Sequence, residues 1–300
     1  YSRYWHGYLV LLKPLLELMD YGKIRILDTI AFMLMLAALV IGFWRRNMRC
    51  GLVAYLLAFL SMFPIAIPKS LQFSSMFYVG SIAMLVLLYG YEILKEKRWI
   101  PYLFLITGMV TSYVDFLTYP VYTLGMSLVL LLILDDGTVR KKLNMLFADS
   151  FFWGIGYAVM WAGKWMMGSL LTGTNLFAEA LRVVSERTSH EVQDEKISVL
   201  FAILRNGYIY ANLLGILLAV AVVLWTGWFF LKYHAAADPG SWCLYILVAC
   251  GPVIWYCVAA NHSYIHYWFT FRDLAVTFFA LCMIPEALCR KKGTNRIEDE

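Results

Sequence analysis

The chain has 300 residues, of which 62% are hydrophobic and only 15% are charged, and its formal net charge is +5. A soluble domain is about half apolar and about a quarter charged, so a soluble fold could not bury this much apolar surface and lipid must be the solvent for much of it. The apolar runs are continuous, which favours membrane helices over a barrel. No basic, aromatic-rich soluble segment is present, which excludes nucleic-acid binding.

The first apolar segment, Tyr8–Met19, is interrupted by Lys13, Pro14 and Glu17. It is too short to cross a bilayer, which takes about 20 residues, and predicts a helix that lies along the outer leaflet. Leu170–Arg187 predicts a second such helix, because its apolar residues recur at helical spacing.

Longer apolar stretches predict about nine membrane-spanning helices in an all-α bundle. In chain order these are Ile26–Trp44, Gly51–Ile67, Phe73–Leu94, Trp99–Tyr113, Tyr119–Leu134, Met145–Trp165, Tyr208–Leu231, Trp242–Ala260 and Trp268–Leu288. The second, fourth and fifth are short for a span. No repeat or linker divides the chain, so residues 1–300 are predicted to form a single transmembrane domain.

The distribution of positive charge predicts the orientation. Alternate connections carry the dense Lys and Arg clusters, which are Arg45–Arg49, Lys95–Arg98, Arg140–Lys142, Lys232 and Arg290–Lys292. Such clusters in short loops are typical of the cytoplasmic side. We therefore expect a multi-pass protein of the cell membrane with its carboxyl terminus in the cytoplasm and Tyr1–Arg25 outside. Because Tyr1 is not a methionine and an odd number of spans starts outside, we also expect at least one further span upstream.

The opposite, outer boundary collects the ionisable residues that the charge clusters do not explain. They are Arg3, His6, Lys69, Asp115, Lys164, His262, His266 and Arg272. Charged and polar groups at the edge of the bilayer are costly and usually functional. We expect them to bind a substrate in a cavity that opens outward.

For these candidates, a purely structural role is the alternative to substrate binding. Arg272 needs a partner, which is Asp273, Asp115 or a phosphate that it grips with two hydrogen bonds. Asp115 is either the side chain of an Asx-turn or an ion partner or base at the cavity mouth. Lys69 and Lys164 are either interfacial anchors or cations for a phosphate, and Lys164, between Trp161 and Trp165, also suits cation–π packing.

His262 and His266 would share one face of a helix at i and i+4. Metal binding is one hypothesis, and an aromatic belt at the membrane boundary is the other. The Glu of HExxH is missing and no third ligand is evident, so we predict no metal and no cofactor, and the spacing does not support a divalent cation. No Walker A, GxGxxG or GxSxG motif is present, so ATP-driven and serine-hydrolase functions have no support.

Four segments carry a resemblance to a known class. Ser2-Arg-Tyr-Trp-His-Gly-Tyr8, Asp115-Phe-Leu-Thr-Tyr-Pro120, Trp161-Ala-Gly-Lys-Trp165 and His262-Ser-Tyr-Ile-His-Tyr-Trp-Phe-Thr-Phe-Arg272 make the chain similar to bacterial polytopic glycosyltransferases of the GT-C type. The resemblance implies transfer of a sugar from a polyprenyl-phosphate carrier to an acceptor at the outer face of the cell envelope. It also implies a catalytic carboxylate in an early outer loop, which we expect upstream of Tyr1, since neither Asp20 nor Asp28 lies in a matching motif.

Two other functions remain open from the sequence. One is a transporter or flippase of a lipid-linked or polar solute, which would favour paired polar residues at mid-membrane and an internal repeat. The other is a membrane scaffold without chemistry. The crowding of polar groups at one boundary favours the enzyme.

Overall fold

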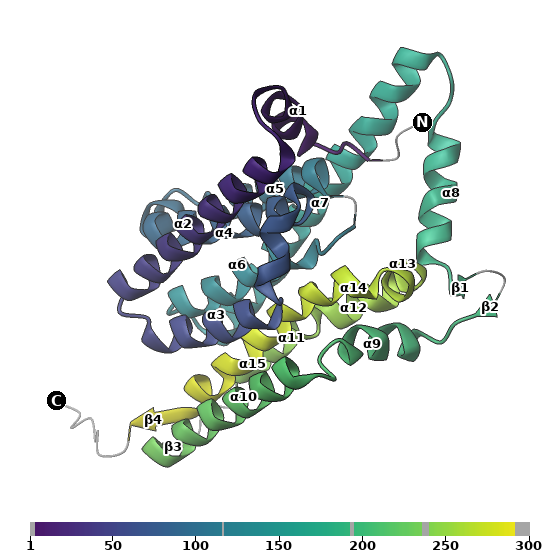
Figure 1. Cartoon of the computed structure of the whole chain (residues 1–300). Helices are drawn as coiled ribbons and strands as arrows, with labels where there is room; N and C mark the ends of the chain where they lie inside the picture. The colour runs from purple at the N-terminus through teal and green to yellow at the C-terminus, as the bar shows by residue number, and fades with distance from the viewer. Residues whose placement is uncertain (1–3, 116, 193–194, 236–239, 292–300) are drawn as a thin grey trace.

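The computed structural model describes residues 4–115, 117–192, 195–235 and 240–291. This part of the chain is nearly all-α, as expected, and most of its helices run side by side in one bundle (Figure 1). The amino-terminal half contributes α1 (Leu9–Leu18), α2 (Tyr21–Arg45), α3 (Arg49–Ser61), the 3₁₀ helix η1 (Pro64–Lys69), α4 (Leu71–Glu96), α5 (Ile100–Val114), α6 (Val121–Leu134) and α7 (Val139–Thr172).

The carboxyl-terminal half is more broken. It contains α8 (Phe177–Thr188), α9 (Val199–Tyr208), α10 (Leu213–Lys232), α11 (Ser241–Ala249), α12 (Gly251–Val258), α13 (Ala260–Ile265), α14 (Tyr267–Thr270), the 3₁₀ helix η2 (Phe271–Asp273) and α15 (Leu274–Leu288). Two short antiparallel ribbons complete the described chain. They are β1 (Glu191–Val192) with β2 (Glu195–Lys196), and β3 (Tyr233–Ala235) with β4 (Cys289–Lys291).

Among the residues that the structure describes, five helical segments are long and apolar enough to cross a membrane. They are α2, α4, α7, α10 and the continuous pair α11–α12, Ser241–Val258. Three further apolar helices, α3, α5 and α6, are shorter. At 1.5 Å per residue, the 15 residues of α5 reach only about 22 Å, less than the hydrocarbon core of about 30 Å. The structure thus supports a membrane protein, while the count of nine spans stays a prediction.

Several predicted elements have different boundaries in the structure, and the predicted seventh span starts only at Leu213, since Tyr208 ends α9. The predicted sixth span continues through Leu170 and Leu171 as part of the 34-residue α7, so the second interfacial helix is confined to α8. The predicted ninth span is divided among α14, η2 and α15. A chain reversal at Gly173, which has a positive φ of 67°, ends α7 and starts the path to α8.

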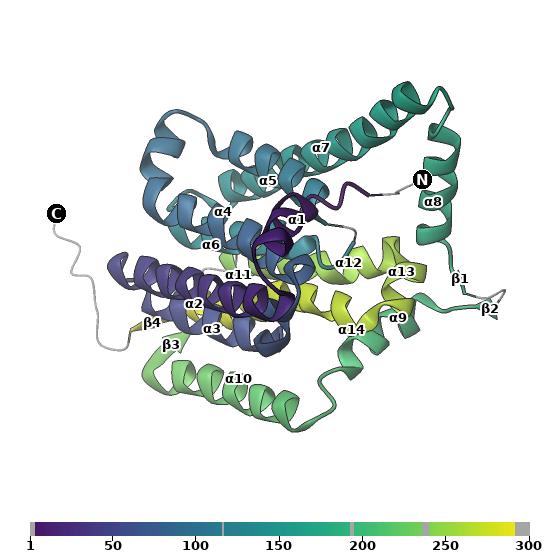
Figure 2. The ribbon, with the colours of Figure 1, turned by 45° about the horizontal axis from the view of Figure 1, so that its top comes forward.

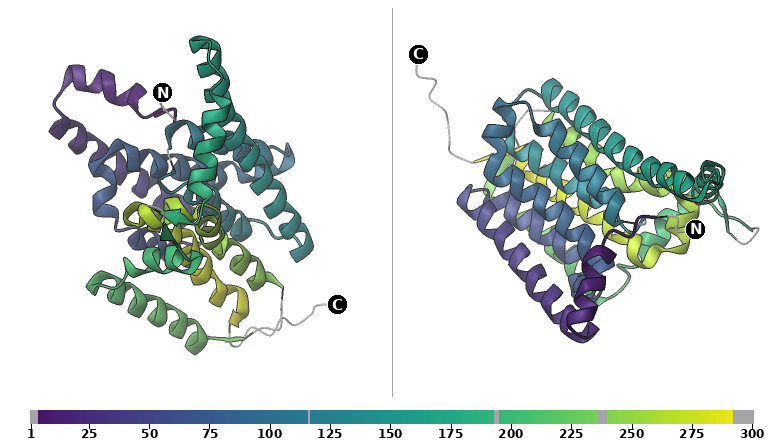
Figure 3. Two further views of the ribbon diagram at one scale, coloured as in Figure 1. Left: turned by 90° about the vertical axis from the view of Figure 1, so that its right-hand side faces the viewer. Right: turned by 90° about the horizontal axis from the view of Figure 1, so that it is seen from above.

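The core lies where α4 packs against α2, α5 and α6, and where α15 packs against α3, α11 and α6. Buried aromatic rings fill it, among them Phe43, Tyr55, Phe77, Tyr122 and Phe279. The most extensive helix pair is α5 with α7. Figure 3 shows α7 extending from this bundle toward α8, which packs on α7 and α13, and α10 along the opposite edge.

The bundle has two chemically different ends. One end, here called the basic end, brings Lys95 and Lys141 to Asp135 and holds the β3–β4 ribbon near the carboxyl terminus. The other, here called the histidine end, holds α8 and α13, the helix that carries His262 (Figure 2). The segregation agrees with the charge pattern from which we predict the two membrane sides, but which end faces the cytoplasm stays a prediction.

Candidate functional site

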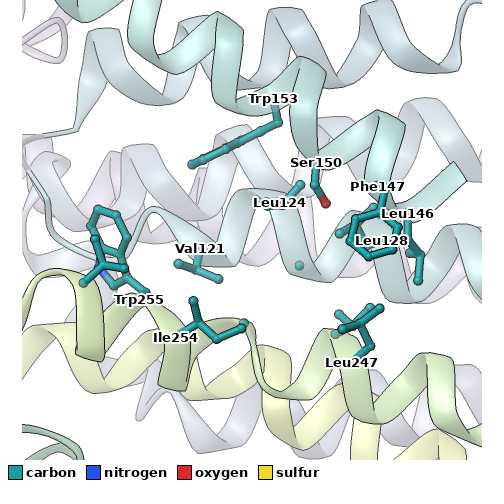
Figure 4. A pocket seen from close by; sticks show the side chains of 14 residues that line it. Val121, Leu124, Leu128, Leu146, Phe147, Ser150, Trp153, Leu247, Ile254 and Trp255 are labelled. Atoms are coloured by element: carbon teal, nitrogen blue, oxygen red, sulfur yellow. The ribbon is translucent and has the colours of Figure 1, made fainter. Parts of the chain in front are cut away.

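An apolar groove lies between α6, α7 and the α11–α12 pair. Its volume is about 340 Å³, and apart from Ser150 its lining residues are apolar. Figure 4 shows Trp153 of α7 on one side of this groove and Ile254 and Trp255 of α12 on the other. The groove is suited to a hydrocarbon chain, because no charged side chain lines it.

A second cavity, of about 180 Å³, adjoins this groove toward the histidine end. Trp255 and Val258 line both spaces, so the two are continuous at these residues. Tyr4, Tyr157 and Arg187 also line the second cavity. We refer to the groove and the cavity together as the amphiphile site, since one part is apolar and the other carries a cation.

Two hydrogen-bond donors of residues that line the second cavity lack partners. The Nε1–H of Trp255 and the Nε–H of Arg187 are buried and have no acceptor among the residues that the structure describes. No carboxylate of the same residues lies within 4.0 Å of Arg187. Buried donors are normally satisfied, so these two indicate the place of an anionic or oxygen-rich ligand.

His262 and His266 do not line this cavity but lie next to two residues that do, Leu117 and Arg187. The ring centroids of the two histidines are 4.7 Å apart, and the Nε2 of His262 lies 2.6 Å from the carbonyl oxygen of Leu117, which fixes Nε2 as the protonated nitrogen. His262 is buried, and its Nδ1 has no partner among the described side chains and backbone groups. Helix α13 ends at Ile265, and His266 is its C-cap residue, with its backbone N–H bonded to the carbonyl of His262.

Burial, with the neighbouring His266, lowers the pKa of His262 to about 3. Burial, with a smaller contribution from Arg187, also lowers the pKa of His266. Both imidazoles are therefore neutral at pH 7 and cannot supply a cation for a phosphate. A neutral His262 offers a hydrogen-bond acceptor at Nδ1, which suits a ligand hydroxyl better than a phosphate.

This geometry predicts acid sensitivity. The unfolded state of His262 takes up a proton near its ordinary pKa of 6.5, and the folded state does so only near pH 3, so stability is lost as pH falls between these values. We expect His262 to account for a loss of about 2 kcal/mol in the free energy of unfolding between about pH 7 and pH 5. The His262→Gln variant should show a shallower decline in thermal unfolding temperature over this range.

The matched control is His190→Gln, because His190 is exposed. It should retain the wild-type dependence on pH. An equal decline for wild type and His262→Gln would contradict the assignment of this acid sensitivity to His262.

Asp115 occupies a turn position. Its carboxylate accepts hydrogen bonds from the backbone N–H of Leu117 at 2.9 Å and of Thr118 at 2.8 Å, and from the Thr118 hydroxyl. This is the Asx-turn alternative raised by the sequence, and Asp115 is 1% exposed. Its carboxylate positions the α5–α6 turn, whose Leu117 carbonyl in turn holds His262.

Lys164 and His6 form a separate group with Trp5. The ammonium of Lys164 lies 5.2 Å from the centroid of the Trp5 ring, and the Trp5 indole N–H donates to the carbonyl of Met160. Burial and the Lys164 charge lower the pKa of His6. These contacts fasten the amino-terminal segment to α7, and the ring beside Lys164 is that of Trp5 and not that of the flanking Trp161 or Trp165.

Arg272 and Lys69 lie elsewhere. Arg272 is 4% exposed, and its guanidinium packs over the rings of Phe73 and Phe271 at 5.2 and 4.8 Å. It makes no ion pair within 4.0 Å with Asp273, which instead accepts from the Tyr122 N–H. The Lys69 side chain is exposed, while its carbonyl accepts from Arg25. Arg3 lies outside the described residues.

Among the described residues, no group of three or more His, Cys, Asp or Glu side chains could hold a metal ion. The site is therefore argued from Arg187, Trp255 and the two histidines.

Comparisons with protein-family models, curated proteins and solved structures find no match. The similarity to GT-C glycosyltransferases thus stays an expectation, and function is inferred from this geometry.

Sequence reasoning missed Arg187 and Trp255. Arg187 ends the predicted interfacial segment Leu170–Arg187, and a helical spacing could have indicated it, because it lies four residues after Val183, which is buried. No sequence pattern distinguishes Trp255, because a tryptophan within an apolar stretch that contains others is typical of a membrane-spanning segment. Asp149 was also missed. It is 1% exposed within α7, and its Oδ2 has no partner in the part of the chain described here.

Proposed function

We propose that the chain binds a polyprenyl-phosphate sugar in the amphiphile site and transfers its sugar to an acceptor at the histidine end. The observation that carries this proposal is the pair of unpartnered donors among the residues that line the second cavity, Trp255 Nε1–H at its junction with the groove and Arg187 Nε–H farther along it. A ligand with a long apolar tail and an anionic head would place its tail in the apolar groove and its head in the second cavity, beside the two donors. The GT-C resemblance points to the same class of donor.

The chemistry follows from the charge of the leaving group. An acceptor hydroxyl attacks C1 of the sugar, the bond from C1 to the phosphate oxygen breaks, and polyprenyl phosphate leaves with the bonding electron pair. The acceptor proton passes to a base, a role that we assign to no described residue because Asp115 is held in its turn. The leaving phosphate gains negative charge, so Arg187 stabilises the transition state more than the ground state.

Binding of the carrier tests the proposal without knowledge of the sugar. The purified protein in nanodiscs is titrated with a long-chain polyprenyl phosphate and with the matching polyprenol, and binding is measured by native mass spectrometry. We expect Arg187→Gln to weaken binding of the phosphate about tenfold, since it removes a charge-assisted contact, and to leave polyprenol binding unchanged. Ser150→Trp should fill the groove and weaken binding of both lipids.

Each variant has a matched control. Arg182→Gln removes an exposed arginine of the same helix α8 that is already paired with Glu179 and Glu186. Val159→Trp adds an indole on α7 at a position that is 58% exposed and does not line the groove. If wild type and Arg187→Gln bind polyprenyl phosphate with equal affinity, the phosphate does not bind next to Arg187. Turnover of a polyprenyl-phosphate sugar with release of polyprenyl phosphate would then establish the transfer step.

One observation favours the transporter alternative. Asp149 is a buried carboxyl group within the long helix α7, and an ionisable group inside a span often marks a transport path. Asp28 does not add to this argument, because Ser74 and Tyr78 both donate to its carboxylate at 2.7 Å. A transporter would move the lipid-linked sugar across vesicles without cleaving it, and a loss of this movement in Asp149→Asn would favour that function over transfer.

A further inference from the structure

Helix α9 presents a second cationic site on the other side of α12–α14. Phe201, Leu204, Arg205 and Tyr208 follow one another at i, i+3, i+4 and i+7, so they share one face of the helix. The three apolar members are 61%, 54% and 73% exposed, respectively. These four residues, with Tyr264, surround an open hollow of about 390 Å³. We call this surface the α9 face.

The position of α10, the next helix along the chain, indicates that the α9 face lies at the membrane boundary. Helix α10 is among the five candidate spans, and it begins at Leu213, five residues after α9 ends at Tyr208. The start of a spanning helix marks the edge of the hydrocarbon core. An amphipathic helix next to that edge lies in the headgroup region with its apolar side chains toward the acyl chains.

Arg205 is held in position by aromatic rings and not by a carboxylate. Its guanidinium carbon lies 4.4 Å from the centroids of both Tyr264 and Tyr267. No acidic side chain of the described residues lies within 4.0 Å of it. The guanidinium therefore keeps its hydrogen-bond donors for a ligand, while the two rings stabilise its charge.

The backbone that carries Arg205 is fixed by the next residue. Asn206 is fully buried, and its amide donates to the carbonyl oxygens of Ala202 and Ser263, at 2.9 and 3.0 Å. Its amide oxygen accepts from the Thr270 hydroxyl at 2.7 Å. These bonds join α9 to α13 and α14, so the hollow is preorganised and its ligand bears little of the cost of ordering the site.

We propose that Arg205 binds the headgroup phosphate of a membrane phospholipid on the α9 face. The phosphate oxygens accept from the guanidinium, and the acyl chains lie along Phe201, Leu204 and Tyr208. The phosphate chemistry is argued from the unpaired guanidinium, and the lipid source from the exposed apolar side chains around it. This site does not depend on the proposed transfer reaction, because Arg187 lines a different cavity.

The test measures the thermal unfolding temperature of the detergent-solubilised protein with added lipid. Phosphatidylglycerol should raise it, because a ligand that binds the folded state stabilises that state. Inorganic phosphate at the same concentration and uncharged dioleoylglycerol should not. Arg205→Gln should require about tenfold more phosphatidylglycerol for the same rise, and Arg205→Lys should lie between the two.

A matched variant shows whether the effect is specific to Arg205. Arg182→Gln, which changes a paired arginine on α8, should respond to phosphatidylglycerol as the wild type does. An unchanged response in Arg205→Gln would overturn the proposal. An equal rise with inorganic phosphate or with dioleoylglycerol would also overturn it, and these comparisons on the wild type hold even if a variant fails to fold.

Discussion

Gly156→Leu is expected to prevent α7 from packing on α5. A Cβ atom at Gly156 would lie 2.1 Å from the carbonyl oxygen of Leu105, and one at Gly108 would lie 2.0 Å from the carbonyl oxygen of Trp153. Both obstacles are backbone atoms, which cannot rotate away as a side chain can. Small residues at helix crossings in membranes allow such close approach. We expect a loss of about 3 kcal/mol or more, as overpacking of a tight contact causes.

The measurement is the midpoint of unfolding by sodium dodecyl sulfate, with the yield of monodisperse protein beside it. Gly154→Leu is the matched control on the same helix, because no atom lies within 4 Å of its Cβ position. It should fold like the wild type. Similar damage from both variants would mean that the effect comes from the glycine backbone and not from the crossing of α5 and α7.

Asp135→Asn is the second change with a large expected effect, at the basic end. Asp135 is 2% exposed, and its carboxylate accepts from Tyr91, from the Gly137 N–H and from the ammonium groups of Lys95 and Lys141. Burial alone would raise its pKa, but these bonds outweigh burial and lower the pKa to about 2. The carboxylate is thus charged at neutral pH, and its stabilising effect is lost only as pH falls below about 4.

Removing this charge leaves two lysines without their shared partner. We expect Asp135→Asn to lose about 2 kcal/mol of unfolding free energy at pH 7, with a smaller difference at high salt, since both lysines are partly exposed. Thermal unfolding in detergent measures it. Asp136→Asn changes the exposed neighbour and should have little effect. A stability equal to wild type in Asp135→Asn would show that this cluster is screened by solvent.

The predicted site residues differ in whether their contacts in the structure come from neighbouring positions in the sequence. Asp115 has the local contact that its sequence neighbours suggest, an Asx-turn. The cation–π partner of Lys164 is instead the distant Trp5, and Arg272 packs both on its neighbour Phe271 and on Phe73 of a distant helix. The role of Arg272 in phosphate binding stays a prediction, and Arg187 is the better placed cation, since it lines a cavity and Arg272 is buried between rings.

The sequence by itself determined that lipid surrounds much of the chain and that its fold is helical. Continuous apolar stretches require helices in lipid, and the clustering of Lys and Arg separates the two ends of the bundle, because both are properties of neighbouring residues along the chain. Tertiary structure decided where α7 ends, how few helices reach spanning length, and which groups meet. Trp255, Arg187 and His262 converge only because α8 folds back from the end of α7 onto α13. That return path depends on packing between distant segments, which no local periodicity contains.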